Sequence, residues 1–292
     1  MWYGTRGKKG LQGRLEEGIM EKKTRTLGLA LGAGGARGIA HVAFLKVLEA
    51  HNVPVSFISG SSMGAVVGGL YSSGVPVSEL EEKALSMRMR EIFDFDLLFF
   101  KRSGLVRGNK IDKMLIAYLG EKTFTDTNIP FGCVAVDVMT GAERHFTEGL
   151  LYQAIHASAA IPSVISPVKI GESYYVDGGI LNRVPADLCY AMGADVVVAV
   201  DVLYRQIEAA PERPKNIVSS FIRTVAIMDR EITAHRLKAD LIVNVSQDEV
   251  SPFRLKNVEK SFEAGMLAAE QAVPHIKKLL EAADPADTDV IL

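Results

Sequence analysis

Short apolar runs alternate along the chain with longer segments in which apolar residues recur at helical spacing. The short runs are typical of strands that are buried on both faces of a parallel sheet. Seven segments carry the strand pattern: Leu27–Leu31, Val55–Ser59, Phe131–Val138, Glu143–Phe146, Tyr174–Val176, Val196–Val200 and Leu241–Val245.

The segments with helical spacing fall between and after these strands. They are Ile39–Leu48, Ala65–Leu70, Ser78–Met89, a helix starting near Asn109, a helix with Pro185 near its start, Phe221–Lys238 and Asn257–Leu280. Ser78 and Glu81 have the spacing of a capping box, and Gly74 and Gly193 are placed to end helices. This alternation predicts a three-layer α/β/α fold around a central, mostly parallel sheet.

The segment Gly60–Gly64 reads G-x-S-x-G and lies between a predicted strand and a predicted helix. In this context the pattern is typical of a strained turn that presents a nucleophilic serine, here Ser62. Gly60 and Gly64 leave room for the turn. The alternative is a glycine-rich strand-to-helix turn without chemistry.

A glycine-rich loop, Gly32–Gly38, follows the first predicted strand and precedes a helical segment. Such a loop lets consecutive backbone N–H groups point at one spot, where they stabilise a phosphate or a transient oxyanion. A dinucleotide fingerprint needs glycine where Arg37 stands, and a phosphate-binding P-loop needs Gly-Lys-Ser/Thr at its end. The oxyanion hole is therefore favoured over nucleotide binding. Its expected donors are the N–H groups of Gly34, Gly35 or Ala36, with that of Met63 after the nucleophile.

Asp177 ends an apolar run and is followed by Gly178 and Gly179. The two glycines permit a tight turn that aims the carboxylate. The apolar residues before it are compatible with burial, which would raise its pKa and make it a better base. An ordinary Asp-Gly turn is the alternative.

Together the three motifs resemble the patatin-like phospholipase family, whose members carry a glycine-rich loop, a G-x-S-x-G elbow and a D-G-G/A motif in this order. Ala33 stands where the family has the first glycine of its loop. The similarity runs from about Leu27 to about Val202 and is strongest to short bacterial members related to the neuropathy-target-esterase branch. It assigns supporting roles to the remaining motif residues: Gly32, Arg37, Gly38, Gly60, Gly64, Gly178 and Gly179.

The resemblance implies a serine hydrolase that acts on lipid acyl esters, of phospholipase A or lysophospholipase type. Its catalytic pair would be Ser62 and Asp177, with no metal and no cofactor. A soluble carboxylesterase without lipid preference and a non-catalytic phosphate- or nucleotide-binding module remain as alternatives. A Ser–His–Asp triad would need a late histidine, and the two candidates, His235 and His275, both lie in helical patterns.

Composition adds few constraints. A formal net charge of −2 gives no indication of nucleic-acid binding, and 48% apolar content suits a large core. Cys133 and Cys189 lie in apolar segments and are expected to be reduced, as in a cytoplasmic protein. We expect a lipid substrate and peripheral contact with the inner face of the membrane through Phe93–Arg102, a phenylalanine-rich segment followed by basic residues. The alternative is that these rings belong to the core or to a subunit interface.

The predicted organisation is one catalytic domain at residues 27–282. Residues 1–26 form an extension without apolar periodicity, expected to be disordered, and Met20 is a candidate for the natural start. Residues 283–292 form an acidic tail that is expected to be frayed. No stretch is apolar for long enough to predict a membrane-spanning helix.

Overall fold

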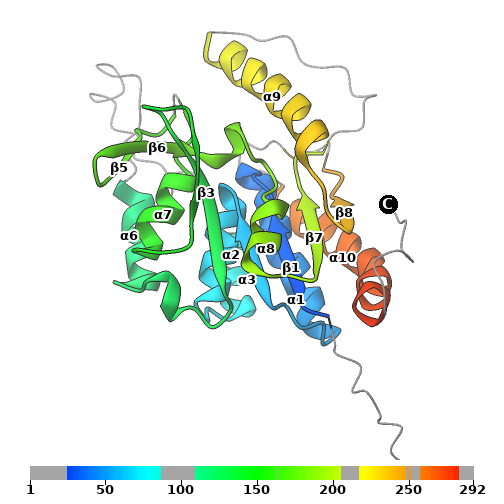
Figure 1. Cartoon of the computed structure of the whole chain (residues 1–292). Coiled ribbons are helices and arrows are strands. Elements are labelled where there is room, and N and C mark those ends of the chain that lie inside the picture. Colours follow the sequence, from blue (N-terminus) through cyan, green and yellow to red (C-terminus); the bar gives the residue numbers. More distant parts are fainter. Residues whose placement is uncertain are drawn as a thin grey trace, which may run out of the picture.

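A mixed sheet lies at the centre of the fold in the computed structural model of the chain (Figure 1), which describes residues 25–86, 109–162, 164–204, 217–247, 250 and 257–282. Its strand order among these residues is β5-β6-β3-β2-β1-β7-β8, and β4 pairs with β3. The strands are β1 (Leu27–Leu31), β2 (Phe57–Gly60), β3 (Phe131–Asp137), β4 (Glu143–Phe146), β5 (Val168–Ile170), β6 (Ser173–Asp177), β7 (Val196–Asp201) and β8 (Leu241–Asn244). The neighbours β3-β2-β1-β7-β8 are parallel, whereas β4, β5 and β6 are antiparallel to their partners.

Helices cover both faces of this sheet (Figure 1). The α-helices are α1 (Ala40–Ala50), α2 (Met63–Ser72), α3 (Val77–Ser86), α6 (Asn109–Leu119), α7 (Leu151–Ser158), α8 (Ala186–Met192), α9 (Ile217–Arg236) and α10 (Val258–Glu281). Three short 3-10 turns complete the set: η1 (Gly35–Ile39), η2 (Phe124–Asp126) and η3 (Gly178–Ile180).

The alternation of side chains along β1 separates the two outer layers. Leu27, Leu29 and Leu31 point into the larger core, which α1, α2 and α10 close. Ala30 points to the other face, into a smaller core that α8 closes. Gly28 belongs to that face because a Cβ there would lie 2.7 Å from the Cβ of Ala194 and 2.9 Å from that of Cys189. A small residue on β1 thus sets how closely the α8 layer approaches the sheet. The predicted three-layer α/β/α fold with a mostly parallel sheet is confirmed.

Most predicted elements are present. Leu27–Leu31 and Glu143–Phe146 have the predicted bounds, and the described ends of the others differ by up to four residues. Two elements were missed. Strand β5 has only three residues and forms because the Gly171 turn, with φ +60°, folds it back on β6. Helix α7 does carry a helical signal, because Leu151, Ala154 and Ile155 are buried at i, i+3 and i+4.

The capping box predicted at Ser78 is wrong. Helix α3 begins one residue earlier, and the carbonyl of Pro76 accepts the N–H groups of Glu79 and Leu80. The carboxylate of Glu81 instead pairs with Lys46 of α1 at 2.6 Å. A tertiary ion pair therefore takes the side chain that the local pattern assigned to the cap.

Several predicted features lie outside the described residues: Phe93–Arg102, residues 1–24 and residues 283–292. Arg25 and Thr26, which were assigned to the N-terminal extension, are described. Thr26 bonds the carboxylate of Asp195 through its N–H at 2.9 Å and its hydroxyl at 2.8 Å, so the fold includes these two residues. No helix among the described residues is long and apolar enough to cross a membrane.

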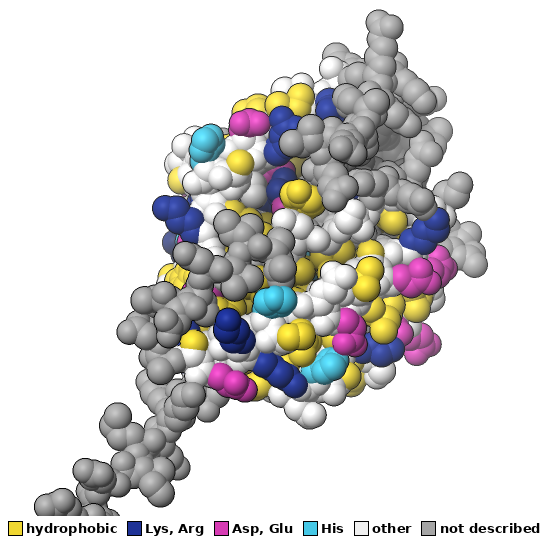
Figure 2. Space-filling view, turned by 90° about the vertical axis from the view of Figure 1, so that its right-hand side faces the viewer, with side chains coloured by type: hydrophobic (Ala, Val, Ile, Leu, Met, Phe, Trp, Pro, Cys, Tyr) yellow, Lys and Arg dark blue, Asp and Glu magenta, His cyan; other side chains and the backbone are white. Residues whose placement is uncertain are grey.

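Charged side chains of both signs are interspersed with apolar ones on the face shown in Figure 2. This distribution agrees with the small net charge of the chain, −2.

Candidate active site

The three sequence motifs meet at the carboxyl ends of β1, β2 and β6. Leu31 and Gly60 are register partners at the ends of β1 and β2, so the glycine loop and the serine turn leave the sheet side by side. A Cβ at Gly38 would lie 2.3 Å from Cγ of Met63, and one at Gly179 would lie 3.0 Å from Ala33. These close approaches show that the loop, the elbow and the Asp-Gly-Gly turn contact one another.

Ser62 occupies a strained turn at the start of α2. Its φ of 55° and ψ of −122° lie in a region that L-residues rarely adopt, and its side chain is nearly buried. Gly64 makes the turn possible, because a Cβ at that position would lie 2.1 Å from the carbonyl oxygen of Leu31. The turn therefore has the geometry expected of a nucleophile elbow.

The backbone N–H of Ser62 has a partner that the sequence analysis did not identify. It donates to Oγ of Ser158 at 3.0 Å, and Ser158 is fully buried at the end of α7. Two residues after Ser158, the carbonyl of Ala160 accepts the N–H of Asp177 at 2.9 Å. The end of α7 thus holds both sides of the serine–aspartate pair.

Asp177 ends β6 and is almost fully buried. Its Oδ1 accepts the N–H of Gly179 at 2.8 Å, and the Ser62 hydroxyl is near enough to the same carboxylate to favour its charged form. Burial raises the pKa of Asp177 to about 6, since the loss of hydration outweighs the two interactions that favour the charged form.

Three hydrogen bonds hold the start of the glycine loop. The N–H of Gly32 donates to Val200 of β7 at 3.1 Å, and the N–H of Ala33 donates to the carbonyl of Arg183 at 2.8 Å. Nε2 of His41 lies 2.8 Å from the carbonyl oxygen of Gly32. Burial lowers the pKa of His41 to about 4, so the ring is neutral at pH 7 and donates through Nε2.

Arg37 anchors the loop from inside the protein. Its side chain is 1% exposed, and Nε donates to the carbonyl of Val250 at 2.7 Å. The Arg37 carbonyl accepts bonds from Gln247 at 3.2 Å and from Ser261 at 3.0 Å. Neither Gln247 nor Ser261 could be predicted as a partner, because they lie 210 and 224 residues away from Arg37.

The backbone N–H groups predicted to form the oxyanion hole have no partner in the part of the chain that the structure describes. Among the described residues, the N–H groups of Gly34, Gly35, Ala36 and Met63 donate to no other group. Gly35 has a φ of 52°, a conformation that glycine adopts freely. Unpaired N–H groups at the start of a helix favour a negatively charged oxygen.

Five of the six histidines have other partners among the described residues: His41, His51, His145, His156 and His275. In the described part of the chain, none is hydrogen-bonded to Ser62 or Asp177. His156 pairs with Asp112 at 2.6 Å, and the late candidates His235 and His275 lie on α9 and α10.

One cluster of described residues could offer atoms to a metal ion: Glu143, His145 and Asp187, whose ligand atoms lie within 4.8 Å of one another. Its carboxylates already pair with the guanidinium of Arg236, at 2.7 Å for Asp187. A cation there would have to displace that charge, so the cluster reads as an ion-pair network.

A comparison with family models decides the relationship. The patatin-like phospholipase model matches residues 29–190, which contain all three motifs. The chain belongs to the patatin-like phospholipase family. The resemblance drawn from the sequence motifs is thereby confirmed.

Relatives of this patatin-like chain fall in the neuropathy-target-esterase branch. An uncharacterized NTE family protein of Mycobacterium tuberculosis is 34% identical over 194 residues, covering 66% of this chain and 54% of that one. Lysophospholipase nte1 of Aspergillus fumigatus is 31% identical over 181 residues, covering 61% of this chain and 12% of that one. Patatin-like phospholipase domain-containing protein 6 of Mus musculus is 30% identical over 186 residues, covering 61% of this chain and 13% of that one. The patatin-like chain therefore spans about half of the first relative and about an eighth of the other two.

A solved structure shares the fold. The crystal structure of VipD from Legionella pneumophila aligns with 88% of this patatin-like chain and 67% of its own, with a TM-score of 0.55 and 12% sequence identity. At this identity the match bears on the fold alone.

Proposed function

We propose that the protein is a serine hydrolase that cleaves acyl esters of lipids, in the manner of a phospholipase A or a lysophospholipase. The proposal rests on one observation above all. A strained, almost buried Ser62 lies close to the buried carboxylate of Asp177, next to a loop whose N–H groups have no partner among the described residues. Family membership and the lysophospholipase relative support the same reaction class.

In the proposed mechanism, Oγ of Ser62 attacks the ester carbonyl carbon and its proton passes to the carboxylate of Asp177. The carbonyl oxygen becomes an oxyanion, stabilised by N–H groups from Gly34, Gly35 or Ala36 and from Met63. The proton then moves to the leaving alcohol, and the C–O bond to that alcohol breaks. Asp177 then takes a proton from water as the water oxygen attacks the acyl carbon. The bond from that carbon to Oγ of Ser62 breaks, the proton passes from Asp177 to Oγ, and the fatty acid is released.

The environment of Asp177 supports its role as the base. An ordinary aspartate, with a pKa near 3.9, binds a proton too weakly to serve well near neutral pH. With its pKa raised to about 6, Asp177 is still charged at pH 7 and accepts a proton more readily. The absence of bonds between the described histidines and this pair also favours a dyad over a triad.

The test combines covalent labelling with turnover. A fluorophosphonate probe should label the wild-type protein, and neither Ser62→Ala nor Asp177→Asn should hydrolyse a lysophospholipid, while both keep the native circular dichroism spectrum. His235→Ala on α9 serves as a matched control and should retain activity. Loss of activity in His235→Ala, or full turnover by Ser62→Ala, would contradict the proposed dyad.

Lipid preference and membrane contact form a separate part of the proposal. The phenylalanine-rich segment Phe93–Arg102 lies outside the described residues and remains the candidate for docking on anionic lipid. Replacing Leu98 and Phe99 with serine should reduce binding to anionic phospholipid vesicles and activity on them, but spare hydrolysis of a short soluble ester. Equal loss of both activities would mean that the segment is structural.

A further inference from the structure

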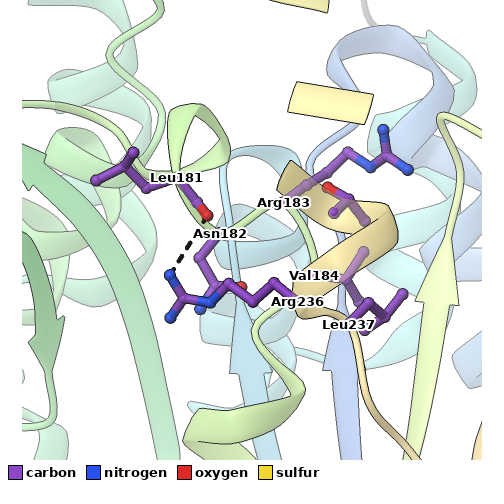
Figure 3. A pocket seen from close by; sticks show the side chains of 7 residues that line it. Leu181, Asn182, Arg183, Val184, Arg236 and Leu237 are labelled. Carbon is purple, nitrogen blue, oxygen red and sulfur yellow. Dashed lines mark hydrogen bonds between the residues drawn. The ribbon is translucent and has the colours of Figure 1, made fainter. Parts of the chain in front are cut away.

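Arg183 links three separate parts of the fold, and the proposed mechanism gives it no role. It follows η3, six residues after Asp177, and its side chain is 8% exposed. Nη2 lies 2.6 Å from Oδ2 of Asp201 at the end of β7, and Nη1 lies 2.8 Å from Oδ2 of Asp229 on α9. Its carbonyl accepts the N–H of Ala33 from the glycine loop. Figure 3 shows Arg183, Leu181 and Arg236 among the residues that line a small pocket at the carboxyl-terminal end of α9.

Helix α9 is attached to the body through a few polar contacts at its carboxyl-terminal half. Asp229 accepts a bond from Arg183, and Arg236 pairs with Glu143 and Asp187. In Figure 1 the amino-terminal half of α9 extends away from the sheet. The Arg183–Asp229 pair is therefore a main attachment of this helix near the site.

The cluster carries one uncompensated charge. Asp201 and Asp229 are both nearly buried, with side chains 3% and 12% exposed, and a single guanidinium faces them. Both carboxylates surround Arg183, which lies six residues after Asp177, and the charge on Asp229 adds to the effect of burial in raising the pKa of Asp177. Of the neighbouring charged groups, Arg236 is already balanced by Glu143 and Asp187, and His41 is neutral.

We propose that Arg183 and Asp229 are positioning residues for the active site: Arg183 connects α9 to the glycine loop, and Asp229 keeps a negative charge at the catalytic end of the sheet. This inference rests on the proposed function, in which Asp177 accepts the serine proton. Burial of Asp177 makes it a usable base, and the charge on Asp229 reinforces that effect.

Asp229→Asn tests the electrostatic part, because it removes the charge and keeps the shape. Arg183 and Asp201 then remain as a balanced pair, so the variant is expected to fold. In the pH profile of kcat/KM for a short p-nitrophenyl ester, the acidic limb should move to lower pH by roughly half a unit. A pKa change of this size is what one nearby charge causes in a protein interior. Glu231→Gln removes the same charge from an exposed position of α9 and should leave the limb in place. An unmoved limb in Asp229→Asn, or an equal shift in Glu231→Gln, would overturn the proposal.

A second measurement does not depend on activity. The pH dependence of unfolding free energy, compared between wild type and Asp177→Asn, reports the proton affinity of Asp177 directly. The pH midpoint of this stability difference reflects the pKa of Asp177. When both proteins also carry Asp229→Asn, the midpoint should lie at lower pH. If wild type proves inactive but this midpoint still moves, the proposed function fails and the charge coupling stands. If hydrolysis depends on Ser62 but Asp229→Asn moves neither the acidic limb of the kcat/KM profile nor the pH midpoint of the stability difference, the charge coupling is wrong and the proposed function stands.

Arg183→Lys and Arg183→Met test whether the ion pairs of Arg183 with Asp201 and Asp229 position the glycine loop. Lysine keeps the charge and should retain most of kcat, whereas methionine leaves two buried carboxylates facing each other and should lower kcat far more than it changes KM. Equal kcat values in the two folded variants would show that the charge of Arg183 does not hold the loop.

Discussion

At the scale of single residues, the backbone of Ser62 is the main site of strain. Its φ of 55° with ψ of −122° costs an L-residue on the order of 1–3 kcal/mol, whereas glycine adopts it freely. Ser62→Gly should therefore be about 1 kcal/mol more stable than Ser62→Ala, because the strain relieved exceeds the extra entropy of unfolded glycine. Urea unfolding of the two inactive variants measures the difference. Equal stability would mean that the turn relaxes in the alanine variant.

Ser158 is predicted to stabilise the nucleophile by accepting its backbone N–H. Ser158→Ala leaves that buried N–H unpaired, which should cost about 1–3 kcal/mol of stability and lower kcat more than it changes KM. Ser72→Ala is the matched control, since Ser72 is equally buried but its hydroxyl has no partner among the described residues. Similar losses in both variants would rule out a specific role for the Ser158 hydroxyl.

Asp177 should make both activity and stability depend on pH. Its pKa is raised from 3.8 to about 6, so the folded state binds this proton more tightly than the unfolded state. The stabilisation is complete below about pH 4 and is lost as the pH rises through 6. Activity should rise through the same range, because the charged form is the base.

Asp177→Asn should consequently be inactive but more stable than wild type at pH 8, by up to about 3 kcal/mol, and no more stable at pH 4. Chemical unfolding at the two pH values checks this difference. A variant that is destabilised at pH 8 would show that the carboxylate is better solvated than its burial indicates.

At the scale of elements, the packing of α10 on α1 depends on one glycine. A Cβ at Gly265 would lie 2.4 Å from the carbonyl oxygen of Ala40, so the helices could not keep their spacing. Gly265→Ala should cost roughly 1–3 kcal/mol despite the better helix propensity of alanine. Glu263→Ala, on the exposed side of the same helix, should change stability little. Thermal unfolding of both variants tests the contact, and a stabilised Gly265→Ala would contradict it.

At the scale of the whole molecule, the sheet buries both cysteines on separate elements. Cys133 on β3 and Cys189 on α8 are free and 0% exposed, and burial raises the pKa of Cys189 to about 12. Neither thiol should react with Ellman's reagent in the native protein, and both should react in guanidinium chloride. Reductant should not change the melting temperature. Rapid labelling of the native protein would show local opening of the sheet.

The sequence alone determined the features that depend on local backbone chemistry. A buried parallel strand, a glycine loop and a strained serine turn are each specified within a few consecutive residues, such as Leu27–Leu31 and Gly60–Gly64. Periodicity and the steric freedom of glycine act over that range, so the fold class, the elements and the three motifs could be predicted. The capping box at Ser78 failed for the converse reason, since a distant lysine took the side chain of Glu81.

Only the tertiary structure decided which groups support these motifs. Ser158 lies 96 residues from the Ser62 N–H that it accepts, and Asp229 lies 46 residues from Arg183. Ser261 reaches the carbonyl of Arg37 across 224 residues. A lone serine or aspartate in a helical segment has the same local pattern whether it faces solvent or a buried N–H. Its partner is chosen when the layers pack, because burial then makes every unpaired polar group costly.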